Sequence, residues 1–486
     1  MSSIEQKNTY LSGFDSLYSE VTDQPLEVIG AIPSWLSGVL LRNGPGAYDR
    51  PDRAAAGEPP VLKHWFDGLS MLHRFEVSDS GVRYSNRLLD SDNKRSVLAT
   101  GKLEYREFAG DPCQSLFRKF FAFSGPKTAP VPNASVNIAV VDGRTAALTE
   151  TPMPVEFDPT TLETVGVIQP DDDLTGNVTT AHPHVRTGSG ELVNSLLTFS
   201  RTSAYKIYRL PPQSTTRILA GTISTDMPSY MHSFALTENY AVLVEFPLVV
   251  NPLLFLLRRR TFIENYSWQP ERGTLIRVLD LRTGEQRALR LDQPLFSFHH
   301  VNAFEEGPVL HLDLSGYEDA SVVETLYLSR LQESGALPPP TLRRIDVDLD
   351  AGTVTHQRIG DATIELPRID SARSQLSYRY TYGASTVGDP SDFLNAIVKI
   401  DVTTGEAIHW HQPGCHPGEP VFVARPGRST GPDGEDDGVL LTVVLDGSTG
   451  VSFLCVLDAR SLTEIARAAA PHAIPFGFHG GFVADR

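Results

Sequence analysis

The chain has 486 residues, of which 41% are hydrophobic and 21% are charged. This composition is typical of a globular protein with a large core and excludes an intrinsically disordered chain. The 59 acidic residues against 42 basic ones give a formal net charge of −17. A chain with this much negative charge repels the phosphate backbone of DNA or RNA. We therefore expect no nucleic acid among its partners.

The N-terminal residues, Met1 to Tyr10, are polar and lack the apolar segment of a signal peptide. The three cysteines, Cys113, Cys415 and Cys455, are widely spaced, so we expect neither a disulfide framework nor a thiolate metal site. Both features favour a reduced, cytoplasmic environment.

Most apolar segments are short, rich in β-branched residues and bounded by turn residues, which predicts strands. Clear examples are residues 135–141, 240–246, 307–314 and 439–445. Residues 111–123 and 251–264 are exceptions. Their composition favours helices or irregular caps over strands.

A weak repeat runs through the chain, in which a strand ends in Asp, passes through a short turn and enters another strand. We interpret each copy as a hairpin whose Asp caps the turn and whose Gly, where present, adopts a positive φ. The period is about 55–65 residues, which favours a β-propeller of about seven units. Such turns also occur in other β-rich folds. The copies centre on Asp158, Asp280, Asp346, Asp401 and Asp458.

Four of the 14 histidines lie beside aromatic or small apolar residues, namely His182, His232, His300 and His479. A buried imidazole needs partners for both ring nitrogens, which a metal and a carboxylate would supply. A propeller would bring such distant residues together on its axis. Spacing alone leaves open the alternative that they are ordinary histidines of the core or surface.

Ordered motifs along nearly the whole chain carry a family resemblance. They include LRNGPG, HWFDG, DPC, LTET, TAHPH, FHHVNAFEE, GEPVF and a terminal FHG. With these motifs the sequence resembles the carotenoid cleavage oxygenases, also called the retinal pigment epithelium isomerase family. LRNGPG, HWFDG and DPC look closer to the animal β-carotene oxygenases and the retinal isomerase than to the plant or stilbene-cleaving branches.

The resemblance implies an all-β fold, a seven-bladed β-propeller with a helical and loop dome covering an axial iron site. It implies an N-terminal extension over residues 1–29 and a single propeller domain over residues 30–486. Cap insertions are expected at about 111–130 and 246–268.

The resemblance also implies one Fe(II) per chain and no organic cofactor. The family ligands fall on His182, His232, His300 and His479. The family's supporting glutamates fall on Glu150, Glu365 and Glu419, which are expected to accept Nδ1–H from three of the imidazoles.

The implied activity is dioxygenase cleavage of one C=C bond of a carotenoid or apocarotenoid by O₂, giving two aldehyde-type products. The chain lacks a dinucleotide fingerprint and a P-loop, in agreement with this chemistry. Alternatives on the same iron site are a retinyl-ester isomerohydrolase and a stilbene-cleaving oxygenase. Thr149 stands where stilbene-cleaving relatives have Lys, which disfavours a phenolic substrate. A non-catalytic propeller scaffold or lipid carrier would need none of these histidines and glutamates.

A polyene substrate has to be taken from a membrane, and one apolar run fits peripheral contact with a membrane surface. Leu253, Leu254, Phe255, Leu256 and Leu257 precede three arginines, so we expect the apolar side chains to enter lipid while the arginines face phosphates. The segment 117–123 is expected to join this patch. The alternative is a buried cap helix followed by a solvated basic turn. The run is too short to span a bilayer, which takes about 20 residues.

The sequence leaves open which double bond is cut, the oligomeric state, and any lipidation of Cys113.

Overall fold

The computed structural model describes residues 9–105, 107–110, 130–257, 260–429 and 431–485. Cys113, the segment 117–123 and most of the expected insertion at 111–130 lie outside the described residues.

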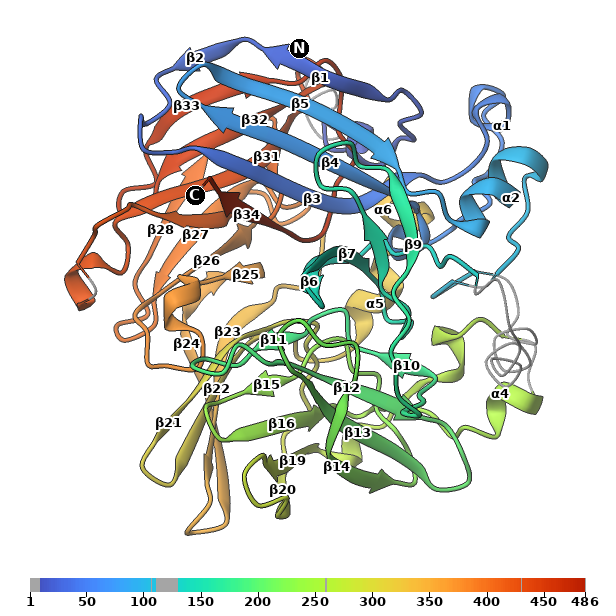
Figure 1. Ribbon diagram of the computed structural model, residues 1–486, viewed down its shortest axis with the longest axis vertical. Coiled ribbons are helices and arrows are strands. Elements are labelled where there is room, and N and C mark those ends of the chain that lie inside the picture. Colours follow the sequence, from blue (N-terminus) through green and yellow to red (C-terminus); the bar gives the residue numbers. More distant parts are fainter. Residues whose placement is uncertain (1–8, 106, 111–129, 258–259, 430, 486) are drawn as a thin grey trace.

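The described residues form seven antiparallel sheets of four to six strands, arranged in chain order around a common centre (Figure 1). This arrangement confirms the predicted seven-bladed propeller. We number the sheets as blades 1 to 7. In chain order, the first strand of blades 2 to 6 lies nearest the axis. Blade 1 begins at the axis with the C-terminal strand β34.

The strands of the first four blades have the following bounds. Blade 1 contains β34 (Gly480–Ala484), β3 (Gly38–Ala47), β4 (Leu69–Ser78), β5 (Gly81–Leu88) and β1 (Val21–Leu26). Blade 2 contains β6 (Asn137–Val141), β7 (Arg144–Leu148), β8 (Val155–Phe157) and β9 (Thr164–Val167). Blade 3 contains β10 (Val178–Thr179), β11 (His184–Val185), β12 (Leu192–Thr198), β13 (Ser203–Leu210) and β14 (Ile218–Thr225). Blade 4 contains β15 (Ala235–Leu236), β16 (Tyr240–Glu245), β19 (Thr274–Asp280) and β20 (Gln286–Leu291).

The remaining strands complete the propeller. Blade 5 contains β21 (His300–Glu306), β22 (Val309–Gly316), β23 (Thr341–Asp348) and β24 (Thr353–Thr363). Blade 6 contains β25 (Glu365–Arg368), β26 (Tyr380–Ser385), β27 (Ala396–Asp401) and β28 (Ala407–His411). Blade 7 contains β29 (Cys415–Pro417), β30 (Val421–Ala424), β31 (Gly438–Asp446), β32 (Val451–Asp458), β33 (Glu464–Ala469) and β2 (Val28–Gly30). A separate pair is formed by β17 (Leu248–Val249) and β18 (Ser267–Trp268).

The two ends of the described chain close the propeller. The C-terminal strand β34 pairs with β3 from the N-terminal part of the chain. Strand β1 pairs with β5 of blade 1, and β2 pairs with β33 of blade 7. The predicted N-terminal extension over residues 1–29 is therefore wrong for its described part, because these residues form the outer strands of two blades.

The predicted Asp turns connect outer strands of five blades: β8 to β9, β19 to β20, β23 to β24, β27 to β28 and β32 to β33. In each turn the Asp side chain accepts the backbone N–H groups two and three residues further on. These residues are Asp158, Asp280, Asp348, Asp401 and Asp458. In blade 5 the prediction of Asp346 as the turn residue is wrong. Its carboxylate pairs with His311 at 2.6 Å within the sheet.

Helices occur in the connections between strands. They are α1 (Pro51–Ala55), α2 (Asp92–Thr100), α4 (Leu254–Leu257), α5 (Ser321–Thr325) and α6 (Leu328–Glu333). Short 3₁₀ turns are η1 (Leu11–Phe14), η2 (Trp65–Asp67), η3 (Ile263–Asn265), η4 (Pro270–Arg272), η5 (Ser371–Arg373) and η6 (Pro432–Gly434). In the described part of the chain, no helix has the length and apolar character needed to cross a bilayer.

Three long connections form a cap over the axis. They lie between β5 and β6, between β17 and β18, and between β22 and β23. Each contributes side chains to one cavity, among them Phe108, Phe262 and Val322. The third connection, which carries α5 and α6, was not predicted from the sequence.

Candidate metal centre

Four imidazoles converge on the propeller axis. They belong to His182, His232, His299 and His479, and one ring nitrogen of each lies within 4.8 Å of those of the other three. The Nε2 atoms of His182 and His232 are 3.0 Å apart, and those of His299 and His479 are 3.1 Å apart. Three of the four side chains are buried, and that of His182 is half-buried.

His300, which was predicted as the third ligand, lies outside this cluster. It is the first residue of β21, and neighbouring residues of an extended chain point to opposite sides. Its Nδ1 lies 2.8 Å from the hydroxyl of Ser233, while the preceding His299 points to the axis. The prediction of His300 is therefore corrected to His299.

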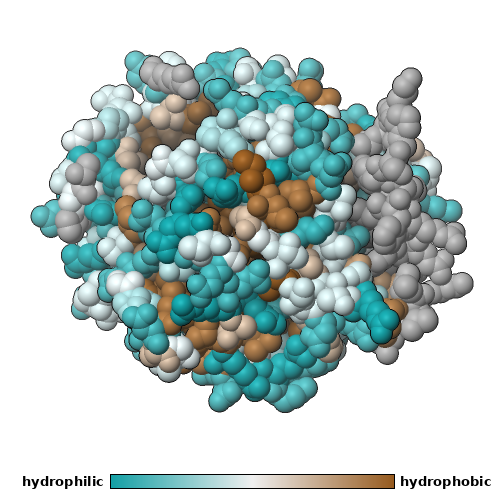
Figure 2. Space-filling model, turned by 60° about the horizontal axis from the view of Figure 1, so that its bottom comes forward, coloured by the Kyte–Doolittle hydropathy of each residue, from teal (hydrophilic) through white to brown (hydrophobic). Residues whose placement is uncertain are grey.

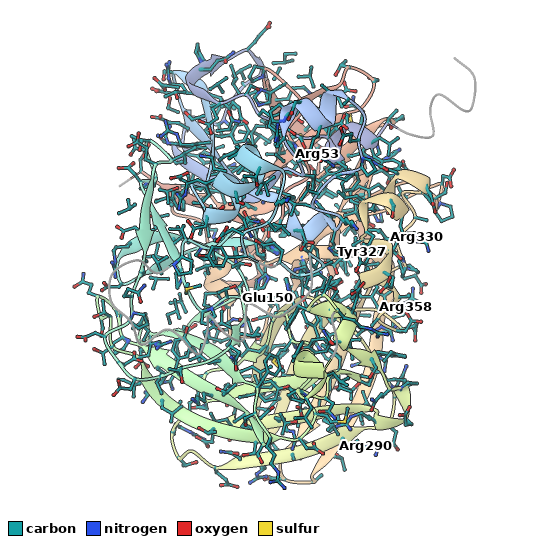
Figure 3. The ribbon with its side chains drawn as sticks, turned by 90° about the vertical axis from the view of Figure 1, so that its right-hand side faces the viewer. Arg53, Glu150, Arg290, Tyr327, Arg330 and Arg358 are labelled. Carbon is teal, nitrogen blue, oxygen red and sulfur yellow. The ribbon has the colours of Figure 1, made fainter. Side chains whose placement is uncertain are left out.

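Three of the imidazoles are hydrogen-bonded to carboxylates through Nδ1, the ring nitrogen that does not face the axis. The Nδ1 of His232 lies 2.7 Å from Glu150, that of His299 lies 2.6 Å from Glu365, and that of His479 lies 2.7 Å from Glu419. The glutamates named from the sequence thus lie directly behind three axial histidines. Figure 3 shows Glu150 near the middle of the molecule.

Each of the seven blades supplies one of these seven residues. His182, His232, His299 and His479 lie at the axial strands of blades 3, 4, 5 and 1. Glu365 begins β25, the axial strand of blade 6, Glu419 lies between β29 and β30 of blade 7, and Glu150 follows β7, the second strand of blade 2. Residues that are far apart in sequence meet because every blade begins at the axis.

The glutamates have further partners that the sequence analysis did not identify. The Tyr230 hydroxyl donates to Glu150 at 2.7 Å, and the Tyr317 hydroxyl donates to Glu365 at 2.8 Å. Glu419 accepts from Arg42 at 2.5 Å and from Arg368 at 2.7 Å. The signal was present in part, because Arg42 belongs to the LRNGPG motif, but no local spacing links it to Glu419.

The donor set fits a cation. The Nδ1 atoms of His299 and His479 both donate to carboxylates, so both Nε2 atoms carry lone pairs. These lone pairs face each other at 3.1 Å without a hydrogen bond between them, an arrangement that a metal ion stabilises. Metal–imidazole bonds of about 2.1 Å place adjacent ligand nitrogens roughly 3.0 Å apart.

Burial keeps three of the four imidazoles, those of His182, His232 and His479, neutral, because it lowers the pKa of each. Burial and the neighbouring His479 lower the pKa of His182 well below its usual value, and burial lowers the pKa of His479 to about 3. Burial would raise the pKa of Glu419, but Arg368, His479 and Arg42 more than offset it and the pKa is lowered. The three carboxylates and two guanidinium groups leave one net negative charge to receive a divalent cation.

A largely apolar cavity opens onto His232, His299 and His479. No Lys or Arg of the described residues lines it. Such a wall suits a long apolar ligand. Its aromatic lining consists of Trp65, Phe66, Phe108, Phe199, Phe262, Phe298, Tyr317 and Phe478.

The residues of the predicted membrane patch differ in exposure. Leu253 is 56% exposed, but Phe255 is only 3% exposed. The Phe255 ring packs 5.0 Å from that of Phe199 and 5.6 Å from that of Phe262. The expectation that Phe255 faces lipid is therefore wrong, because its side chain belongs to the core.

This geometry defines a class of protein, namely β-propellers that bind an axial metal through histidine side chains alone. The family model described as retinal pigment epithelial membrane protein matches residues 14–484. The β,β-carotene 15,15′-dioxygenase of Mus musculus is 32% identical, over 94% of this chain and 89% of the mouse protein. A chloroplastic carotenoid cleavage dioxygenase 8 homologue of Oryza sativa subsp. japonica is 33% identical, over 98% of this chain and 88% of the rice protein.

Solved structures agree with these relatives. A cobalt-substituted form of the Synechocystis apocarotenoid oxygenase superposes with a TM-score of 0.84 at 28% identity, covering 98% of this chain and 99% of that one. The chain belongs to the retinal pigment epithelial membrane protein family, the family of the carotenoid cleavage oxygenases. The four-histidine site is the metal site typical of the family's non-haem iron.

Proposed function

We propose that this protein is an Fe(II)-dependent dioxygenase that cleaves one C=C bond of a carotenoid or apocarotenoid with O₂, giving two aldehyde products. The observation that carries the proposal is the convergence of four imidazoles at the wall of an aromatic cavity. Iron held by His182, His232, His299 and His479 would supply the activation of O₂.

The chain's own residues position the reaction. Glu150, Glu365 and Glu419 hold the Nδ1 protons of three imidazoles and so aim Nε2 at the axis. The rings of Phe66 and Phe298 lie 6.2 Å and 5.6 Å from that of His232, so a polyene against them would lie beside the metal. The apolar wall also excludes water from the site.

The proposal is tested by incubating iron-loaded protein with β-carotene and with a long apocarotenal in detergent, and identifying aldehydes by mass. We expect two aldehydes whose masses add to one substrate and one O₂. A lack of aldehydes from both substrates, together with a shifted cis/trans ratio of a retinyl ester, would replace the proposal with the isomerohydrolase activity.

We also propose that the protein takes its substrate from a membrane surface with which it associates peripherally. Leu253 is exposed immediately before α4, and Arg260 is exposed shortly after the helix. An exposed leucine followed by an exposed cation suits an interface of acyl chains and phosphates. Figure 2 shows one face of the molecule, on which hydrophobic patches lie among hydrophilic residues.

Sedimentation with vesicles of phosphatidylcholine and phosphatidylserine tests this docking. We expect Leu253→Glu to lower the bound fraction several-fold, because a carboxylate at this position would be repelled by anionic lipid. The matched control is Leu376→Glu, which changes a leucine that is 41% exposed and lies after η5. Equal binding of both variants and of the unchanged protein would refute docking through Leu253.

A further inference from the structure

One carboxyl group lines the cavity without holding an axial histidine. Among the described residues, three glutamates line the cavity, and Glu150 and Glu365 are bonded to His232 and His299. The third, Glu107, is hydrogen-bonded to Asn93 and, among the described residues, to none of the axial histidines. It lies immediately before Phe108, in the connection between β5 and β6 that forms part of the cap.

The position of Glu107 is fixed by two buried residues. The side-chain amide of Asn93, at the start of α2, donates to Oε1 of Glu107 and also to the carbonyl of Tyr105. The carboxylate of Asp67 accepts the backbone N–H of Ala109 with both oxygens, at 3.1 Å and 3.2 Å. The segment is therefore held on both sides of Glu107.

The surroundings of Glu107 favour its protonated form. Asp67 is fully buried, and none of the described Lys or Arg residues forms an ion pair with either carboxyl group. Burial raises the pKa of Asp67 to about 7. Burial and the nearby Asp67 raise the pKa of Glu107 well above its usual value.

A protonated carboxyl group at this position has a hydrogen-bond donor for which no described residue supplies the acceptor. Oε1 of Glu107 is occupied by the amide of Asn93, so the proton resides on the other oxygen. Around it the wall is largely aromatic and aliphatic, and the neighbouring Phe108 ring lies 5.3 Å from that of Phe66. A donor in an apolar cavity selects ligands that bring an acceptor to it.

We propose that Glu107 is a specificity-determining residue, which binds an oxygen-bearing end group of the polyene, a hydroxyl or carbonyl, through a hydrogen bond. The inference rests on the proposed function for the polyene itself. It assigns to this enzyme a preference for oxygenated over purely hydrocarbon end groups. In the empty cavity the Glu107 hydroxyl donates a hydrogen bond to water. A hydrocarbon end group would displace that water without accepting the hydrogen bond, whereas an oxygenated end group would accept it, and this difference produces the preference.

The test compares β-carotene with zeaxanthin, which differ only in two ring hydroxyl groups. Dissociation constants are measured without O₂ by quenching of tryptophan fluorescence, and kcat/KM is measured in air. In the unchanged protein we expect zeaxanthin to have the lower dissociation constant and the higher kcat/KM. We expect Glu107→Leu to reduce the zeaxanthin-to-carotene ratio by about 10-fold to 100-fold in both measurements, with Glu107→Gln intermediate because its amide retains a donor.

Two controls separate the possible outcomes. Retained affinity of Glu107→Leu for β-carotene shows that the variant is folded, and Glu104→Leu, which removes an exposed carboxylate from the same segment, should leave the ratio unchanged. An unchanged ratio in Glu107→Leu, or an unchanged protein that rejects zeaxanthin, overturns the inference. Binding without cleavage of either substrate would refute the proposed function and still decide the role of Glu107.

Discussion

His299 and His300 are chemically identical neighbours with different surroundings. His299 donates through Nδ1 to Glu365 and directs Nε2 to the axis. His300 is held by Ser233, and its Nε2 is buried without a hydrogen-bond partner among the described residues. The sequence could indicate that this pair contributes a ligand, but not which member, because that depends on where β21 begins.

We predict that His299→Ala loses iron and that His300→Ala retains it. Removing His299 deletes a ligand and leaves Glu365 without its imidazole partner, whereas removing His300 leaves all four axial nitrogens in place. Metal analysis of both purified variants after anaerobic loading with Fe(II) measures the difference. Full iron content in His299→Ala would contradict the assignment.

Glu150 offers a second prediction at this scale. Glu150→Gln should lower iron affinity or turnover by about 10–100-fold, because the amide accepts the Nδ1 proton of His232 more weakly than a carboxylate does. Glu156→Gln is the matched control, since Glu156 lies in β8 away from the axial histidines. Wild-type turnover and iron content in Glu150→Gln would refute the role of Glu150.

At the scale of elements, the Asp turns show what a repeat can reveal. The period predicted the outer hairpins, and Gly284, Gly352 and Gly405 supply positive φ in three of them. In the other two turns Leu162 and Leu462 adopt φ of 60° and 55°. Both leucines are buried, at 0% and 3% exposure, so packing outweighs the backbone preference for glycine.

Leu462→Gly should therefore destabilise the protein. Relief of the left-handed conformation gains about 1 kcal/mol, but loss of a buried leucine costs about 2–5 kcal/mol. We expect the free energy of unfolding in urea to fall by about 1–4 kcal/mol. Gln213→Gly is the control, because Gln213 has φ of 58° but is exposed, so the gain of about 1 kcal/mol from strain relief should appear there without a loss of burial. A Leu462→Gly variant as stable as the unchanged protein would contradict this, because relief of strain would then fully offset the lost burial.

Segment α4 and the blade 5 turn show where element-scale prediction fails. The run from Leu253 to Leu257 is uniformly apolar, so no polar residue marks which side faces the core. The apolar pattern therefore predicts an exposed Phe255, whereas its side chain packs on Phe199 and Phe262. Likewise, the sequence IDVDLD offers several Asp residues, and only the hairpin register selects Asp348 over Asp346.

At the scale of the whole molecule, each of the seven blades contributes one side chain to the axial site. The sequence predicted the propeller and six of the seven axial residues, with the family resemblance supplying the ligand set. It did not reveal Tyr230, Tyr317, Arg42 and Arg368 as partners of the glutamates. Those contacts join residues of separate blades and have no local sequence signal.

Iron should stabilise the propeller as a unit, because its four ligands come from four blades. A metal bound only by the folded state adds about 4 kcal/mol when free metal is 1,000 times the Kd. We expect anaerobic Fe(II) to raise the Tm of the unchanged protein and of His300→Ala, and not that of His299→Ala. Differential scanning calorimetry measures this shift. An equal rise in all three proteins would indicate that iron acts elsewhere.

The central claim is that a four-histidine iron centre uses O₂ to split a polyene double bond. Its most direct test is turnover of β-carotene or an apocarotenal under ¹⁸O₂ in ordinary water, with the aldehydes reduced at once to alcohols to prevent exchange. We predict one ¹⁸O atom in each of the two products. Unlabelled oxygen at a carbonyl group formed from the cleaved double bond, at the earliest times and after correction for exchange, would contradict the account; the aldehyde oxygen that an apocarotenal already carries stays unlabelled.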